Sequence, residues 1–334
     1  ENAVFALRPD GNLVLTDSDA RIAWQSNTAN LGVQGFKILK NGNMVLYDAN
    51  SKYVWQSFSS PTDTLLVDQY LRRGSPTTLV SRLSNKNNTN GPYIMIVEPT
   101  RLAMYYSSSL YFSTAKWLTV SGLNQLTLRA GSRTNRPYDV SLEFQPGKGK
   151  VQNVVLARPS RNPVMSYLRL GIDGNVRVRS YNEAANIQAW TTIFTLFDGG
   201  AGSDGECQLP TKCGEFGICS GGKCVTCVTG SPFVNSSRAW NPSCGPPLLN
   251  SCAWKDYVYN KLVGVDHFVS KYTIGQGPMS EKDCSEICSQ NCKCEGYFYH
   301  QATSRCWAVD HLNTLTSVQD NTRLGFIKVP IYVG

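Results

Sequence analysis

The chain has 334 residues, of which 41% are hydrophobic and 17% charged, a composition typical of a folded protein and not of a disordered one. No apolar run approaches the roughly 20 residues that cross a bilayer, so no membrane span is expected. The formal net charge is +8, and all twelve cysteines lie between Cys207 and Cys306. An even number of clustered cysteines predicts a disulfide framework made in an oxidising compartment, where nucleic acid is not an expected partner.

A 31-residue unit occurs twice at the start of the chain. The segment 10–15 (DGNLVL) recurs as 41–46 (NGNMVL), and the Trp-Gln-Ser of 24–26 recurs at 55–57. Asp-Gly or Asn-Gly between alternating apolar residues is a strong hairpin signal. Each unit is therefore predicted to form antiparallel strands.

Side chains along a strand alternate between two faces. Asn12, Val14 and Thr16 therefore share one face, and Leu13 and Leu15 take the other, where we expect them to fill the core. The tryptophan of each unit is expected to add a large buried area. Because units of this size need about three copies to bury a core, we expect N-terminal sequence to be missing. Association of two copies into a homo-oligomer is one hypothesis that follows.

A weaker copy of the unit, 173–178 (DGNVRV), is followed by Trp190, and the gap from Asp to Trp grows from 14 to 17 residues. It predicts a second, diverged module. The stretch 116–181 contains eleven basic and three acidic residues, so its net charge of +8 equals the whole surplus of the chain. It is interpreted either as a solvated face or as a surface for acidic polysaccharide. Its arginines include Arg158, Arg161, Arg169, Arg177 and Arg179.

Other short patterns carry weaker signals. Cys224 and Cys227 have zinc-ligand spacing, but with three histidines and no second pair at ligand spacing no metal or cofactor is expected. Asn87 and Asn235 open glycosylation sequons in polar stretches and are predicted to carry glycan. Ser203 lies in 201–205 (AGSDG), which differs by one residue from the G-x-S-x-G motif of a nucleophile elbow. The surrounding segment is rich in glycine, which favours a linker. The sequence shows no catalytic constellation, and the chain is not expected to be an enzyme.

The repeated unit, together with 55–66 (WQSFSSPTDTLL), closely resembles the bulb-type mannose-binding lectin domain of plant proteins. The segment 207–219 resembles the S-locus, EGF-like cysteine cluster, and 284–306 resembles the core of a PAN domain. The same order of modules is found in the plant epidermis-type secreted glycoproteins. The chain is identified as a member of that family, which places it outside cells, in the apoplast or cell wall.

The resemblance implies a mainly β protein with tandem β-prism modules, followed by a small disulfide-rich EGF-like module and an α+β PAN domain. The expected boundaries are 1–84 for the first lectin domain, 85–198 for the second, 199–250 for the EGF-like module and 251–334 for the PAN domain.

The PAN core that this segment resembles would pair Cys284 with Cys306 and Cys288 with Cys294. The pairing of the other eight cysteines is left open, because spacing does not fix connectivity. The first two of these four cysteines would lie one turn apart on a short helix. Ser280 and the acidic residues after it are predicted to cap that helix.

Sugar sites of the family resemble Q-x-D-x-N-x-V-x-Y, in which polar groups hydrogen-bond hydroxyls and the valine packs on the ring. Both copies in the first module depart from this pattern, since Arg8 and Leu39 replace Gln and Thr16 replaces Tyr in the first copy. The resemblance assigns carbohydrate binding to Asp10, Asn12, Val14, Asn41, Asn43, Val45 and Tyr47. The alternative is that Asp-Gly-Asn is kept because the hairpin turn needs it.

The predicted function is weak or residual binding of mannose-type or cell-wall glycans, including acidic polysaccharide. The alternative is an extracellular scaffold that has lost sugar binding and holds a protein partner. Several degenerate sites acting together could raise the avidity of a weak lectin.

Overall fold

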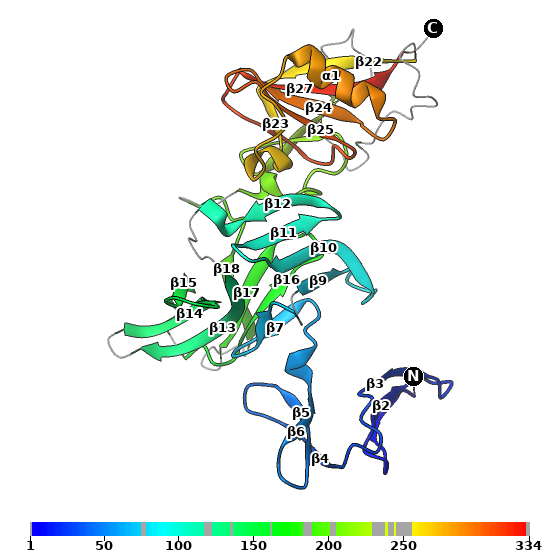
Figure 1. The fold of residues 1–334 in the computed structure, drawn as a ribbon, viewed down its shortest axis with the longest axis vertical. Coiled ribbons are helices and arrows are strands. Elements are labelled where there is room, and N and C mark those ends of the chain that lie inside the picture. Colours follow the sequence, from blue (N-terminus) through cyan, green and yellow to red (C-terminus); the bar gives the residue numbers. More distant parts are fainter. Residues whose placement is uncertain are drawn as a thin grey trace.

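The computed structural model describes residues 2–74, 78–116, 122–133, 136–160, 162–182, 189–200, 205–228, 238–239, 244 and 256–331. These residues form seven small β-sheets and one α-helix, arranged along the chain from the N-terminal sheets to a C-terminal module at the opposite end (Figure 1). The expectation of a mainly β protein is confirmed.

Each copy of the 31-residue unit folds as a three-stranded antiparallel sheet, and the two sheets are called the first module. The first sheet contains β1 (Val4–Leu7), β2 (Leu13–Thr16) and β3 (Ile22–Gln25), and the second contains β4 (Val33–Ile38), β5 (Met44–Asp48) and β6 (Tyr53–Gln56). The predicted hairpins are confirmed. Gly11 and Gly42 take φ values of +84° and +85° in the turns, a conformation that glycine adopts without strain.

Aromatic side chains join the two sheets of the first module. The rings of Trp24 and Trp55 meet edge to face at 5.5 Å. Leu13 is buried as predicted, but Leu15 is only half-buried and Val14, on the opposite face, is 2% exposed. The expected division into one core face and one surface face is therefore wrong at Val14.

Three four-stranded antiparallel sheets follow and form the second module. Each sheet takes its first strand from residues 64–82, and Leu65, Leu71 and Leu79 on these three strands are fully buried in one common core. The second module thus includes strands from both sides of residue 84. The sheets are β7 (Thr64–Leu66) with β16 (Ser166–Leu170), β17 (Val176–Asn182) and β18 (Ala189–Thr195); β8 (Tyr70–Arg72) with β13 (Leu123–Arg133), β14 (Arg136–Pro146) and β15 (Gln152–Ala157); and β9 (Thr78–Arg82) with β10 (Asn90–Val97), β11 (Leu102–Tyr106) and β12 (Ser109–Ser113).

The cysteine-rich segment is linked to the C-terminal module by a shared sheet. Strand β19 (Gly217–Ser220) pairs with β20 (Lys223–Cys227) on one side and, in parallel, with β26 (Leu315–Ser317) on the other. Beyond them lie β21 (Arg238–Ala239) and β23 (Val265–His267). The disulfides described are Cys207–Cys219, Cys213–Cys224, Cys227–Cys244, Cys284–Cys306 and Cys288–Cys294.

The C-terminal module packs one helix against a second sheet. The helix α1 (Glu281–Gln290) begins with a capping box in which Ser280 and Asp283 satisfy each other's backbone N–H, as predicted. Both cysteine pairs implied by the resemblance are bonded here. The sheet contains β22 (Tyr257–Val263), β27 (Arg323–Pro330), β24 (Gly296–His300) and β25 (Arg305–Val309). The short helices among the described residues are η1 (Ser57–Ser59), η2 (Thr114–Lys116), η3 (Glu206–Gln208) and η5 (Phe268–Lys271).

Candidate functional site

Asn12, one of the predicted sugar-binding residues, is buried and connects its own hairpin to the next strand. Its Nδ2 donates to Oε1 of Gln25 at 3.0 Å. Its Oδ1 accepts from the hydroxyl of Ser26 at 3.1 Å and from the backbone N–H of Thr28 at 3.2 Å. We call this set of bonds the asparagine network.

The asparagine network recurs around Asn43 in the second sheet. Asn43 donates to Gln56 at 2.9 Å and accepts from Ser57 Oγ and the N–H of Phe58, both at 3.2 Å. Gln and Ser of the repeated Trp-Gln-Ser motif are therefore the hydrogen-bond partners of the repeated asparagine. This contact explains why the two motifs recur at one fixed offset.

The third copy forms the same network with backbone partners. Asn175 is fully buried, accepts from the N–H of Phe197 at 3.2 Å and donates to its carbonyl at 3.3 Å. In each copy the residue two positions before the asparagine accepts its backbone N–H, at 2.9 to 3.2 Å, and so forms the turn. Those three residues are Asp10, Asn41 and Asp173.

The apolar and aromatic residues of the predicted sugar sites also make their contacts within the protein. Val45 is fully buried, like Val14, so neither side chain offers a surface to a sugar ring. The ring of Tyr47 lies under the ammonium group of Lys37, 4.3 Å from the ring centroid, and is packed over Gly35. The contacts of these residues fit the alternative role in the hairpin, and their binding of mannose stays a prediction.

Strand register changes the assignment of the third tryptophan. Leu15 pairs with Trp24 and Leu46 with Trp55, and the equivalent partner of Val178 is Phe194. Trp190 instead pairs with Tyr181 and is 45% exposed. The expectation that Trp190 is the counterpart of the first two tryptophans is therefore wrong, because a register shift between β17 and β18 places Phe194 at their position and Trp190 on the outer face. The expected large buried area is also wrong at Trp24, which is 39% exposed.

The outer face of β16 and β17 carries a polar cleft of about 440 Å³, which we call the arginine cleft. Its arginines Arg169, Arg177 and Arg179 alternate along the strands with the buried Leu168, Val176 and Val178. Two of its arginines, Arg177 and Arg179, replace the valine and the tyrosine of the third sugar motif. The cleft is lined by Asp63, Arg82, Asn85, Tyr167, Arg169, Leu170, Gly171, Ile172, Asp173, Arg177 and Arg179.

Two aspartates hold three of the four arginines in place. Asp63 contacts Arg82 Nε at 2.9 Å and Arg169 Nε at 3.4 Å. Asp173 accepts two bonds from Arg177, at 3.0 and 2.6 Å. Burial alone would raise the pKa of Asp173, but the hydrogen bonds and charge of Arg177 hold that pKa below its ordinary value.

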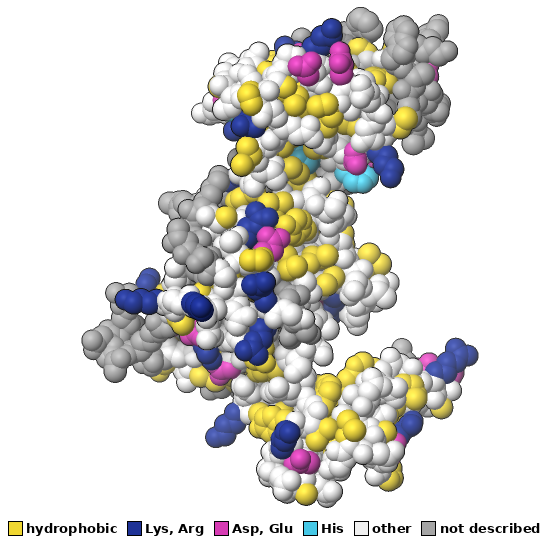
Figure 2. Space-filling model, in the orientation of Figure 1, with side chains coloured by type: hydrophobic (Ala, Val, Ile, Leu, Met, Phe, Trp, Pro, Cys, Tyr) yellow, Lys and Arg dark blue, Asp and Glu magenta, His cyan; other side chains and the backbone are white. Residues whose placement is uncertain are grey.

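The arginine cleft keeps a positive excess beside an aromatic surface. Among the described residues no ion pair involves the exposed Arg179. Tyr167 in the cleft meets the ring of Trp190 at 4.9 Å, and Trp190 meets Tyr181 at 5.5 Å. Basic side chains are spread over the middle of the molecule in the view of Figure 2. The site therefore combines guanidinium donors with flat apolar rings.

The sequence indicated only part of this cleft. The basic stretch includes Arg169, Arg177 and Arg179, but Asp63 and Arg82 lie far earlier in the chain and join the cleft through β7 and β9. No sequence signal ties them to it.

The structure places one of the two predicted glycosylation sites and both cysteines of the possible zinc-binding pair. Asn87 is exposed, and its Oδ1 accepts from the hydroxyl of Thr89 at 2.9 Å, whereas Asn235 lies outside the described residues. Cys224 and Cys227 both belong to disulfides, so their thiolates are not available to zinc. Over the described part of the chain no group of side chains could hold a metal ion, and no helix there is long and apolar enough to cross a membrane.

The sequence of the chain is similar to those of known proteins. Residues 1–87 match the family model described as D-mannose binding lectin. The chain is 41% identical, over 99% of its length and 76% of the relative, to EP1-like glycoprotein 3 of Arabidopsis thaliana. It is 42% identical, over 79% of its length and 73% of the relative, to the Epidermis-specific secreted glycoprotein EP1 of Daucus carota.

Among solved structures, the two-domain fetuin-binding lectin of Scilla campanulata is 17% identical to this chain. The match covers 58% of this chain and 88% of the lectin chain, with a TM-score of 0.22, and no argument about the fold is based on it. The identities with the glycoproteins are high and extend through every module of the chain. The chain therefore belongs to the EP1-like glycoprotein family, a family of secreted, non-enzymatic plant glycoproteins with a bulb-type lectin domain.

Proposed function

We propose that this protein binds acidic cell-wall polysaccharide in the arginine cleft of its second module. The observation that carries the proposal is the replacement, at the third copy of the sugar motif, of Val and Tyr by Arg177 and Arg179 on an outer strand face. The asparagine side chains of all three copies are engaged within the protein, whereas Arg177 and Arg179 of the third copy line a cleft at the surface. The glycan-binding surface is accordingly assigned to the third copy.

The chemistry of the cleft suits a chain of uronic acids. A guanidinium group binds a carboxylate with two parallel, charge-assisted hydrogen bonds. The apolar face of a pyranose ring can pack on an exposed aromatic ring such as Trp190. With four arginines and two aspartates the cleft keeps an excess of two positive charges. Binding at such an exposed site is expected to be weak and to decrease as salt rises.

We also propose the finer architecture that the family implies: two β-prism lectin modules, an EGF-like module and a PAN domain. The boundaries near 84, 198 and 250 are part of this proposal. Mannose binding at Asp10, Asn12, Asn41 and Asn43, with their neighbouring Val and Tyr, remains a second proposed activity.

A scaffold that holds a protein partner is the alternative function. The observation in its favour is the exposure of large apolar side chains on the first module. Phe5 is 49% exposed, and Ile38 is 65% exposed. Such a surface on a folded module favours contact with another protein.

The test is calorimetric titration of the intact protein with oligogalacturonide, a uronic-acid oligomer, and separately with a mannose oligomer. Arg179→Ala is expected to weaken oligogalacturonide binding about tenfold, which corresponds to the loss of one charge-assisted hydrogen bond. Raising the salt should weaken the wild-type binding further. Arg158→Ala, at an exposed arginine that does not line the cleft, is the matched control and should bind like the wild type.

Two outcomes would contradict the proposal. Oligogalacturonide binding that is unchanged in both Arg179→Ala and Arg179→Glu would remove the cleft from the function. Binding only to the mannose oligomer, lost in Tyr47→Ala, would assign the function to the first module. The absence of binding to both oligosaccharides would favour the scaffold function.

A further inference from the structure

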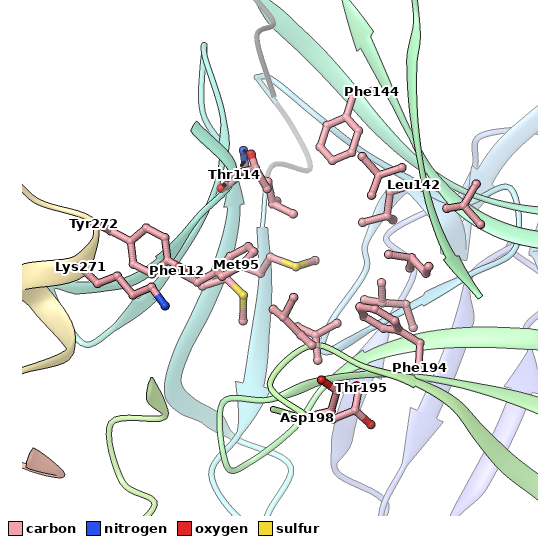
Figure 3. Close-up of a pocket in the computed structure, with 18 residues that line it drawn as sticks. Met95, Phe112, Thr114, Leu142, Phe144, Phe194, Thr195, Asp198, Lys271 and Tyr272 are labelled. Atoms are coloured by element: carbon pink, nitrogen blue, oxygen red, sulfur yellow. Dashed lines mark hydrogen bonds between the residues drawn. The ribbon is translucent and has the colours of Figure 1, made fainter. Parts of the chain in front are cut away.

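The interior of the second module contains a cavity of about 390 Å³. It lies between the three sheets, on the inner side of the same sheet whose outer side carries the arginine cleft. Met95 and Phe112 reach it from the β9–β12 sheet, Phe144 from β14, and Phe194 from β18 (Figure 3). Protein interiors are normally packed closely enough that few voids exceed one water molecule. A space of this size is therefore in the range of ligand sites.

The strand register explains why the space exists. Phe194 occupies the position of Trp24 and Trp55, the two tryptophans that meet at 5.5 Å between the sheets of the first module. A phenyl ring is smaller than an indole ring. The second module therefore has a smaller ring at this one position than the repeat pattern would supply, and Phe194 itself lines the cavity.

The inner wall is apolar. Met104 and Leu168 are fully buried there, and two methionines give the wall flexible thioether side chains that adapt to the shape of an apolar ligand. The one fully buried polar residue of the wall, Thr114, uses its hydroxyl on the backbone of Leu102, accepting from its N–H at 2.9 Å. Its hydroxyl is thus already used, and the inner wall favours hydrocarbon.

Exposed polar side chains are also among the residues that line the cavity. Asp198 follows β18, and Lys271 and Tyr272 come from η5 and the residue after it in the C-terminal module. Lys271 and Asp198 are exposed. Figure 3 shows Lys271 and Tyr272 at one margin of the apolar side chains, beside Phe112, and Asp198 at another margin, beside Thr195. A ligand with one hydrocarbon part and one polar end matches this arrangement.

We propose that the cavity binds a single-chain lipid, with its alkyl chain among the residues around Phe194 and its small oxygen-bearing head beside Lys271. The head can be a carboxylate, which pairs with the ammonium group, or a hydroxyl, which hydrogen-bonds at the same place. The second module would then bind polysaccharide on one side of the β16–β18 sheet and lipid on the other.

The experiment loads the intact protein with the neutral apolar dye N-phenyl-1-naphthylamine and displaces it with dodecanoate or with dodecanol. Both are expected to displace the dye, and free mannose is not. Phe194→Trp restores the residue of the first two copies, fills the cavity and should weaken dye and lipid binding at least tenfold. Trp190→Phe, on the outer face of the same strand, is the matched control and should keep lipid binding.

Additional variants test the cavity wall and the preferred head group of the lipid. If Phe194→Trp does not fold, as judged by circular dichroism, Leu142→Phe fills another part of the wall and should have the same effect. Lys271→Glu should weaken dodecanoate binding more than dodecanol binding if the carboxylate is the preferred head, and both equally if it is the hydroxyl. Failure of both lipids to displace the dye, or full binding in the folded filled variants, would overturn the proposal. Neither result depends on whether polysaccharide binds the arginine cleft.

Discussion

Replacing Asn43 by alanine is expected to lower the stability of the β4–β6 sheet by about 2 to 4 kcal/mol. The substitution removes the acceptor of the buried Phe58 N–H and of the Ser57 hydroxyl, and it removes the donor to Gln56. Each buried polar group left without a partner costs about 1 to 3 kcal/mol. Amide hydrogen exchange of peptides from β5 and β6 should accelerate by about a hundredfold, since 1.4 kcal/mol corresponds to a factor of ten.

Asn41→Ala is the matched control for this prediction. The side chain of Asn41 accepts one backbone N–H, that of Asn43 at 3.2 Å, and it is only half-buried. Its loss should cost no more than about 1 kcal/mol, the contribution of a typical hydrogen bond. Hydrogen exchange is the suitable measurement because a chain of several modules need not unfold in one step. Equal, small effects of the two variants would mean that the asparagine network is not what holds the sheet together.

The repeat was enough to predict the local structure of the first module. Asp-Gly and Asn-Gly at hairpin positions, with alternating apolar residues, determine β2 and β5 through interactions within a few residues. The helix α1 was predicted for the same reason, since Ser280 and Asp283 act within one turn. Features that depend on neighbours close in the sequence are the ones that a single sequence reveals.

The roles of individual side chains were less predictable, because they depend on strand register. Asn12 could bind a sugar or bond to Gln25 and Ser26, and the motif is the same in both cases. The bulge between β17 and β18 likewise decides that Phe194, and not Trp190, faces the interior. An insertion of three residues before the tryptophan is visible in the sequence, but its effect on the two strand faces is not.

The C-terminal module contains a buried histidine that makes its stability depend on pH. His267 is 2% exposed, with its ring 4.0 Å from that of Phe268 and stacked at 5.2 Å on that of Phe298. Its Nδ1 accepts from the N–H of Val269 at 3.3 Å, and its Nε2 is buried without a hydrogen bond. Burial lowers the pKa of this imidazole to about 3, and the nearby backbone of His311 and Leu312 offsets this only in part.

The sign of the effect follows from the two protonation states. The folded pKa lies below the value of about 6.5 that an unfolded histidine has, so the unfolded chain takes up the proton first as the pH falls. The contribution of His267 to the free energy of unfolding is constant above about pH 7 and becomes increasingly destabilising as the pH falls from about 6.5 to about 3. Lowering the pH from 7 to 5 should therefore cost about 2 kcal/mol of stability through this residue alone.

The substitution His267→Asn should remove this component of the pH dependence, because asparagine keeps an oxygen that can accept from Val269 at the start of η5 but does not titrate. The difference in stability between pH 7 and pH 5, measured by hydrogen exchange in β24 and β27 and corrected for the intrinsic effect of pH on exchange, should shrink by about 2 kcal/mol. Phe268→Leu removes a neighbouring aromatic ring without removing a titrating group, so it should lower stability at both pH values and keep the difference. If His267→Asn and Phe268→Leu retained the same pH dependence, the buried imidazole would not be its source. The acid sensitivity of the module would then have to come from carboxylates whose pKa is lowered in the folded state, such as Asp283, which is hydrogen-bonded to Ser280, and Asp320, which is hydrogen-bonded to Thr322.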